Sequence, residues 1–168
     1  MELYYTVFQT AAGWIAVIAS PGGLLENSFP RISKEDALNS LHIAKYDGLF
    51  SPSPGKFSDL SRRFKDYFDG KRADFDDRLD LSSCTAFQKD VWEAARTISY
   101  GETRSYQWLA DKIGKPFAAR AVGQALGKNP LPLIVPCHRV IGSTGKITGF
   151  SGGLDLKRKL LEIEGTII

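Results

Sequence analysis

Residues 105–127 read SYQWLADKIGKPFAARAVGQALG and decide how the second half of the chain folds. Ser105 is a helix-capping residue, and the helix that it opens is predicted to continue to Ile113 and to stop at Gly114. Pro116 then stands where the first turn of a second helix would begin, and mostly small and apolar residues carry that helix to the end of the stretch. Two short helices joined by a glycine-containing turn are typical of a helix-turn-helix, whose second helix can enter a groove of DNA. An ordinary helical hairpin with a basic exposed side is the alternative.

Further helices are predicted on both sides of this stretch. Thr85 and Gln88 form a capping box ahead of an apolar stripe, which predicts a helix that ends before Tyr100. A last helix is predicted over residues 155–164, because its leucine and isoleucine side chains share one face. The second half of the chain is therefore expected to be helical.

The first half follows a different pattern. Three short runs of β-branched and aromatic residues, separated by turn residues, predict an antiparallel meander. A short helix capped by Ser33 and a longer helix that ends at Gly70 follow, with a proline-rich break between them. Residues 71–84 are polar and acidic, and we interpret them as the link between two domains, 1–80 and 81–168. The predicted strands are Leu3–Phe8, Trp14–Ala19 and Leu24–Phe29.

The charge of the chain is unevenly distributed. Its 168 residues are 43% apolar and 24% charged, which is typical of a globular protein and excludes disorder, collagen and a coiled coil. Residues 1–84 carry 10 basic and 12 acidic side chains, whereas residues 85–168 carry 12 basic and 7 acidic ones. This asymmetry favours an anionic partner for the second half, although a solvated basic face would give the same pattern.

Cysteine and histidine are scarce, which limits the possible chemistry. Two residues of each type allow neither a disulfide framework nor a four-ligand zinc site, so no metal or cofactor is expected. The first residues lack the basic segment of a signal peptide, and no apolar run approaches the roughly 20 residues that span a bilayer. We therefore expect a cytoplasmic protein with reduced thiols and no membrane partner. The residues are Cys84, Cys137, His42 and His138.

Residues 129–140, NPLPLIVPCHRV, contain the candidate reactive group. Three prolines and an apolar run predict a rigid, extended segment that holds Cys137 and His138 in place. A thiol has a pKa of about 8.5 and becomes a good nucleophile when a base takes its proton. His138 could be that base, directly or through a water molecule, and Glu164 could orient its imidazole. A buried, inert thiol is the alternative for Cys137.

Five motifs stand in order along the second half: Gly101-Glu102 with Ser105-Tyr106, Ala118–Gly123, Asn129-Pro130, Pro136–Val140 and Ser151–Leu154. Together they resemble the O6-alkylguanine-DNA alkyltransferases, over roughly residues 85–165. The resemblance implies an α+β fold, with a small antiparallel N-terminal sheet and helices similar to ribonuclease H, and a helical C-terminal domain that contains the helix-turn-helix. It implies DNA repair by irreversible, stoichiometric transfer of the alkyl group of O6-alkylguanine, and also of O4-alkylthymine, from double-stranded DNA to a cysteine.

The resemblance implies catalytic roles for five residues. Cys137 would accept the alkyl group, and His138 and Glu164 would form the relay that makes its thiolate. Tyr106 would crowd the phosphate that must rotate and would donate a hydrogen bond to the extruded base. Asn129 would brace the turn behind Cys137. Each molecule would react once, because water has no easy route to expel the sulfur from the thioether product.

The resemblance also implies contacts with DNA and with the base. Arg120 would push into the base stack from the minor groove and occupy the space of the flipped nucleotide. Backbone carbonyls at Cys137 and Val140 would accept from the guanine amine, and the Ser151 backbone would meet O6. Lys157 would donate a proton or line the pocket. The other implied DNA-binding residues are Ser105, Tyr106, Ala119, Ala121, Gly123 and Lys128, and the other pocket residues are Phe150 and Gly152.

Phe150 stands where the family often has tyrosine, so the ring remains but the hydroxyl is lost. The zinc ligands of some relatives are missing. The resemblance implies a monomer, associated with the nucleoid, that can cooperate along DNA.

Three alternative functions are weaker. A non-catalytic binder of alkylated DNA would lack Cys137, and a helix-turn-helix transcription regulator would not need a Cys-His pair. A cysteine hydrolase or redox enzyme would show a local signature that is missing here.

Overall fold

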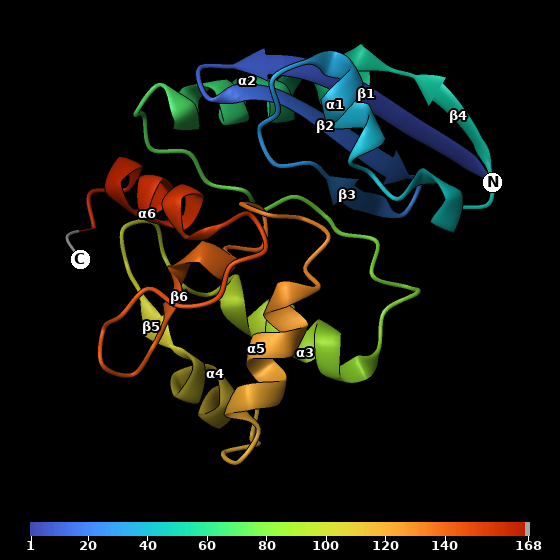
Figure 1. Ribbon diagram of the computed structural model, residues 1–168. Helices are drawn as coiled ribbons and strands as arrows, with labels where there is room; N and C mark the ends of the chain where they lie inside the picture. Colours follow the sequence, from blue (N-terminus) through green and yellow to red (C-terminus); the bar gives the residue numbers. More distant parts are fainter. Residues whose placement is uncertain (167–168) are drawn as a thin grey trace. The chain divides into compact units, whose positions relative to one another are not determined.

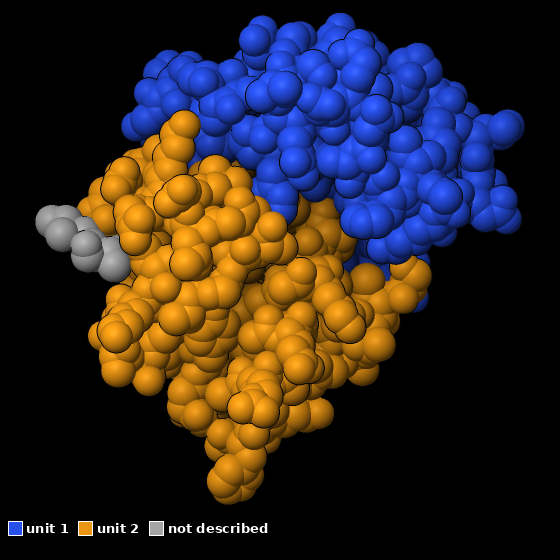
Figure 2. All heavy atoms as spheres, viewed as in Figure 1, with its two compact units in different colours: residues 1–82 blue, residues 83–168 orange. Residues whose placement is uncertain are grey.

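The computed structural model describes residues 1–166, and the chain divides into two compact units, Met1–Ser82 and Ser83–Ile168 (Figure 2). Unit 1 contains a four-stranded sheet with helices, and unit 2 consists mainly of helices (Figure 1). This combination confirms the predicted α+β class. Within residues 1–166, no helix combines the length and the apolar character that crossing a membrane requires.

The sheet of unit 1 is mixed rather than purely antiparallel. Strands β1 (Glu2–Thr10), β2 (Gly13–Ser20) and β3 (Gly23–Asn27) form the predicted antiparallel meander. A fourth strand, β4 (Leu49–Pro52), pairs in parallel with β1 and gives the order β3-β2-β1-β4. The expectation of an antiparallel sheet is therefore wrong at this edge. The proline-rich sequence at β4 is typical of a break between secondary-structure elements. An edge strand nevertheless tolerates proline, because one of its sides has no partner strand.

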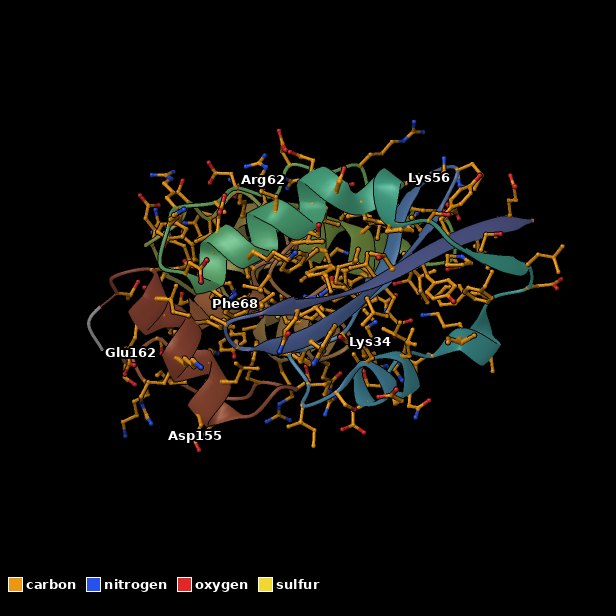
Figure 3. All side chains as sticks on the ribbon, turned by 90° about the horizontal axis from the view of Figure 1, so that it is seen from above. Lys34, Lys56, Arg62, Phe68, Asp155 and Glu162 are labelled. Atoms are coloured by element: carbon orange, nitrogen blue, oxygen red, sulfur yellow. The ribbon has the colours of Figure 1, made fainter. Side chains whose placement is uncertain are left out.

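Two helices cover opposite faces of this sheet (Figures 1 and 3). Helix α1 (Lys34–Asn39) begins after its predicted serine cap and packs over the face that carries Leu3. Helix α2 (Ser58–Phe68) packs over the other face, where the ring centroids of Phe8 and Phe64 are 5.6 Å apart. Successive side chains of a strand point to opposite faces, so β1 supplies both layers of the core. Two short 3-10 helices, Ile43–Lys45 and Pro54–Phe57, flank β4.

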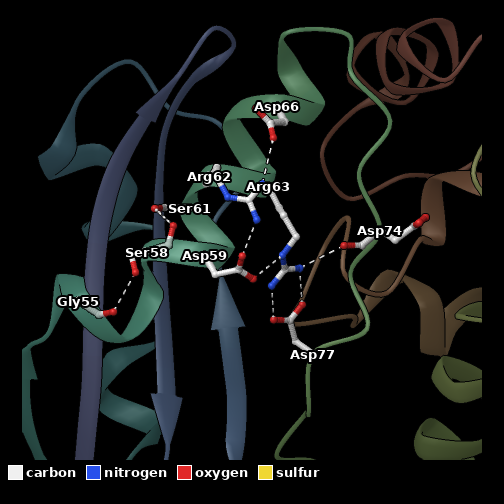
Figure 4. Close-up of polar contacts among 9 residues, drawn as sticks. All are labelled: Gly55, Ser58, Asp59, Ser61, Arg62, Arg63, Asp66, Asp74 and Asp77. Atoms are coloured by element: carbon white, nitrogen blue, oxygen red, sulfur yellow. Dashed lines mark hydrogen bonds and ion pairs between the residues drawn. The ribbon is translucent and has the colours of Figure 1, made fainter.

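Residues 71–82 are packed against unit 1 instead of forming a free link. Arg63 of α2 donates to both carboxylate oxygens of Asp77, at 2.8 and 2.6 Å, and to the backbone carbonyl of Asp74 at 3.1 Å (Figure 4). Backbone hydrogen bonds of 2.9 and 2.8 Å also join this segment to Leu24 in β3. Most of the segment that we interpret as the link between the domains is thus packed within unit 1, which extends to Ser82.

Unit 2 contains the four predicted helices. They are α3 (Ala86–Ala95), α4 (Tyr106–Lys112), α5 (Ala119–Gly127) and α6 (Leu154–Ile163). The capping box at the start of α3 is present as predicted. The indole Nε1 of Trp92 in α3 donates to the carbonyl of Ala125 in α5 at 2.9 Å, which ties these helices together in the core.

A short parallel pair that the sequence did not predict also belongs to unit 2. Strand β5 (Arg104–Ser105) pairs with β6 (Val140–Ile141), and a 3-10 helix over Cys137–Arg139 comes directly before β6. The pair places the chain around the candidate cysteine next to the start of α4.

The connection between α4 and α5 is a tight turn. Ser105 caps α4, and Gly114, at a φ of +75°, ends it in the left-handed conformation that favours glycine. Pro116 lies in the turn, because the Ala118 N–H donates to the Lys115 carbonyl at 2.9 Å. The prediction that a helix begins at Pro116 is therefore wrong. The fixed φ of a proline suits the first central position of a β-turn as well as the first turn of a helix.

Candidate active site

Asn129 ties together the turn that precedes Cys137. Its Nδ2 donates to the Val135 carbonyl at 2.9 Å, and its Oδ1 accepts from the Leu131 N–H at 2.9 Å. Between these contacts Leu133 has a φ of +75°, the only positive φ of a non-glycine residue within residues 1–166. A leucine is strained in this conformation and keeps it only where its surroundings enforce it.

The Cys137 thiol is buried, with the residue 6% exposed. Its Sγ accepts a hydrogen bond from Asn129 Nδ2 at 3.2 Å. Burial raises the pKa of the thiol, whereas the Asn129 hydrogen bond and the positive charge of Lys157 act to lower it. The resting sulfur is therefore a protonated thiol, and its activation needs a group that removes the proton.

His138 and Arg139 converge on one buried carboxylate, that of Glu164. His138 Nε2 is 2.6 Å from Glu164 Oε2. Arg139 donates through Nε to Oε1 at 2.7 Å, through Nη2 to Oε2 at 3.1 Å, and through Nη1 to the Ile98 carbonyl at 2.7 Å. The Gly101 N–H also donates to Oε1, at 3.2 Å. The carboxylate thus lies among three hydrogen-bond donor residues from two segments of unit 2.

These contacts fix the protonation of the network. Burial alone would raise the pKa of Glu164, but the hydrogen bonds and charges of His138 and Arg139 lower it well below its ordinary value of 4.5. Burial lowers the pKa of His138, and the attraction of Glu164 only partly opposes this. At neutral pH, a neutral His138 therefore donates Nε2–H to the carboxylate and keeps a lone pair on Nδ1. That Nδ1 is buried and has no hydrogen-bond partner among residues 1–166, so it can accept a proton.

Arg139 is a site residue that the sequence interpretation missed. Its side chain is 10% exposed, and its bonds to Glu164 hold the carboxylate that orients His138. The available signal was its place directly after His138 in the motif. From sequence alone, however, an arginine there reads equally well as a solvent-exposed contact to phosphate.

Lys157 and Tyr106 hold the loop that follows β6. Lys157 is fully buried, and its Nζ donates to the carbonyls of Val140 at 2.6 Å and Thr148 at 2.7 Å. The Tyr106 hydroxyl donates to the same Thr148 carbonyl at 3.0 Å. Burial lowers the pKa of Lys157 to about 8, while Cys137 acts in the opposite direction. The Val140 carbonyl, which the resemblance assigns to the guanine amine, thus already accepts one hydrogen bond from Lys157.

The remaining predicted residues lie at the start of α4, on and directly after α5, and in the loop before α6. A Cβ added at Gly123 would be 3.6 Å from the Tyr106 ring, so the two helices approach closely there. The Phe150 ring centroid is 5.9 Å from Lys157 Nζ. Within residues 1–166, no group of three or more His, Cys, Asp or Glu side chains could hold a metal ion. Arg120, Ala121, Lys128 and Ser151 are exposed, and Ser105, Ala119, Gly123, Phe150 and Gly152 are half-buried.

Curated relatives extend over the whole chain. Residues 86–166 match the family described as 6-O-methylguanine DNA methyltransferase, DNA binding domain. A methylated-DNA–protein-cysteine methyltransferase of Methanosarcina acetivorans is 40% identical over 164 residues, which cover 98% of this chain and 99% of the relative. A protein of the same name from Mycobacterium bovis is 56% identical over 115 residues, which cover 68% and 69% of the two chains.

Solved structures give the same result. A crystal structure of Mycobacterium tuberculosis OGT in complex with DNA matches with a TM-score of 0.77 at 43% identity, over 96% of this chain and 92% of that one. The O6-methylguanine-DNA methyltransferase of the archaeon Pyrococcus kodakaraensis matches with a TM-score of 0.71 at 28% identity, over 98% and 99%. The chain therefore belongs to the methylated-DNA–protein-cysteine methyltransferase family.

Proposed function

We propose that this chain repairs DNA by transferring the alkyl group of O6-alkylguanine in double-stranded DNA to Sγ of Cys137. The observation that carries the proposal is a buried thiol next in sequence to His138, whose Nε2 is 2.6 Å from Glu164 Oε2 and whose buried Nδ1 has no hydrogen-bond partner among residues 1–166. Family membership supports the same reaction. A non-catalytic lesion binder would have no use for this arrangement of cysteine, base and acid.

In the proposed reaction, His138 Nδ1 takes the proton of the thiol, directly or through one water molecule. Glu164 stabilises the imidazolium that forms, and Arg139 keeps that carboxylate ionised. The thiolate attacks the alkyl carbon, so that an S–C bond forms as the C–O6 bond breaks and its electron pair stays on the guanine. The leaving guanine takes up a proton from water, with the Tyr106 hydroxyl turned from the Thr148 carbonyl to donate a hydrogen bond to the base. His138 then returns the thiol proton to water, so guanine and histidine both end neutral. The thioether is stable, so each molecule reacts once.

Access to O6 requires the base to leave the duplex, which costs a few kcal/mol and less for a mispaired, damaged base. We assign α5 to the minor groove, where its small residues fit closely, and Arg120 to the space of the flipped nucleotide. Most contacts are then to phosphates, so binding is weakly sequence-specific and sensitive to salt. The same attack applies to O4-alkylthymine. In this proposal the chain acts as a monomer in the cytoplasm, and several copies can bind along one DNA.

The decisive experiment mixes the reduced, folded protein with a duplex that contains one O6-methylguanine and maps the adduct by peptide mass spectrometry. We expect one methyl group on Cys137 and none on Cys84, the other cysteine of the chain. The Cys137→Ser variant should lose transfer and keep its affinity for the duplex. A folded wild-type sample without alkylation of Cys137 would overturn the proposal.

The role of Arg120 can be tested separately from the chemistry. Arg120→Ala should slow repair in a duplex far more than reaction with the free base O6-benzylguanine, which needs no flipping. Lys146→Ala, on the exposed loop after β6, serves as a matched loss of one exposed cation. Equal losses of Arg120→Ala on both substrates would argue against insertion of Arg120 into the duplex.

A further inference from the structure

Phe117 is the most exposed large apolar side chain within residues 1–166, at 101% relative exposure. It lies in the turn between α4 and α5. This turn forms the lower end of unit 2 in the view of Figure 1. Its ring therefore contributes nothing to the core of the unit. A single exposed apolar residue is common on protein surfaces, so the support of its backbone and the residues around it decide whether it has a role.

The turn that carries Phe117 is held rigidly. The Ala118 N–H donates to the Lys115 carbonyl at 2.9 Å, which closes a β-turn with Phe117 at its third position. Gln107 of α4 donates through Nε2 to the Pro116 carbonyl at 2.7 Å, directly before Phe117. Pro116 also fixes its own φ. Because the backbone is already ordered, a partner that covers the ring loses little affinity to the ordering of this loop.

The charged residues around Phe117 are mainly basic, and the one acid nearby in sequence, Asp111, accepts a hydrogen bond from Gln107 Nε2 at 2.9 Å. Residues 112–128 contain four basic side chains and no acidic one. Lys115 and Arg120 lie two residues before and three residues after Phe117, and both are exposed. An apolar ring among exposed cations suits a polyanion with apolar surfaces between its charges. A DNA duplex has this chemistry, with sugars and base edges between two rows of phosphates.

We propose that Phe117 contacts the duplex directly, as an apolar wedge that packs on sugars and base edges in the groove that α5 occupies. This inference rests on the proposed function and adds to it a DNA contact that carries no charge. A cation on phosphate releases counterions, so its contribution to affinity falls as salt rises. The contribution of the Phe117 ring is the same at every salt concentration.

The test measures the Kd for a labelled duplex by fluorescence anisotropy at several salt concentrations. Phe117→Ala should weaken binding about tenfold, which is typical for removal of one aromatic side chain that contacts bases, and should leave the slope of log Kd against log salt unchanged. Phe117→Leu should recover part of the affinity. Lys128→Ala, in contrast, should reduce the slope by about one. Ile32→Ala removes a 92% exposed apolar side chain from unit 1 and should change neither quantity.

The outcomes separate this inference from the proposed function. If wild-type protein binds and repairs the duplex but Phe117→Ala binds equally well, the Phe117 contact is refuted and the proposed function stands. A change in salt slope for Phe117→Ala would assign its effect to charge and would also refute the wedge. Phe117→Ala should react with free O6-benzylguanine at the wild-type rate, and a slower reaction would place the defect in the active site instead. If the wild-type protein neither binds nor repairs the duplex, the proposed function itself fails.

Discussion

Replacing Arg139 by methionine should destabilise unit 2 by about 3 kcal/mol. The buried guanidinium donates twice to Glu164 and once to the Ile98 carbonyl. Methionine fills much of the same volume but supplies none of these hydrogen bonds. Removal of one partner from a buried ion pair costs about 3 to 5 kcal/mol. We expect the lower end, because Glu164 keeps His138 and Gly101 as donors.

Urea unfolding followed by tryptophan fluorescence can measure this loss in unit 2 alone. Trp14 belongs to unit 1, whereas Trp92 and Trp108 belong to unit 2, so a Trp14→Phe background restricts the signal to unit 2. Arg158→Met is the matched control on α6. Its guanidinium is 57% exposed and its ion pair is long, at 3.9 Å, so it should cost less than about 1 kcal/mol.

Loss of Arg139 should also change the kinetics of the reaction. The charge of Arg139 acts to lower the pKa of His138, so its removal should raise that pKa. The reaction with O6-benzylguanine needs neutral His138. As the pH is lowered, the rate of the variant should therefore begin to fall at a higher pH than the rate of the wild type. A destabilisation of Arg139→Met no larger than that of Arg158→Met, together with an unshifted pH profile, would refute the role given to Arg139.

Three further predictions concern the same site. The pKa of Glu164 is lowered in the folded protein, so the stability that its ionised carboxylate gives is complete above the ordinary pKa of 4.5 and is lost as the pH falls below that value. In Glu164→Gln, the urea midpoint should therefore depend less on pH between about pH 5 and pH 3. A pH dependence equal to that of the wild type would contradict this. Asn129→Ala removes the hydrogen bond to Cys137 and should move the pH midpoint of thiol alkylation by iodoacetamide upward; a midpoint at or below the wild-type value would count against it. Lys157→Met should speed amide hydrogen exchange in residues 141–150, because two carbonyl contacts are lost, whereas equal exchange would show that Lys157 does not hold the loop.

Local signals in the sequence were enough to predict most helices of unit 2. Thr85 and Ser105 cap helices as expected, and Gly114 ends one, because caps depend on neighbouring backbone groups. Strands β4, β5 and β6 were missed, since two to four residues carry no periodicity and their parallel partners are distant in sequence. The start of α5 was misplaced because Pro116 suits a turn as well as a helix start.

In the candidate site, too, local sequence predicts some features, whereas others depend on contacts between residues that are distant in sequence. Cys137, His138 and Asn129 lie within one motif, and their mutual arrangement follows from a short, rigid stretch of chain. The pairing of Arg139 with Glu164 and the burial of Lys157 depend on how α6 packs, which no local pattern records. A lysine is almost never fully buried without partners, so its contact with backbone carbonyls had to come from the structure.

The position of Glu164 in the chain also sets an order of events during synthesis. Glu164 follows His138 by 26 residues, so the ribosome releases the cysteine and its histidine well before the acid that orients them. Until that residue emerges, His138 and Arg139 have no carboxylate to meet, and the motif is present without its relay. In the proposed mechanism, which uses each molecule once, the thiol therefore lacks its relay until Glu164 has been added. By the time Glu164 is added, residues 83–163 of unit 2 are already synthesised and can fold around it.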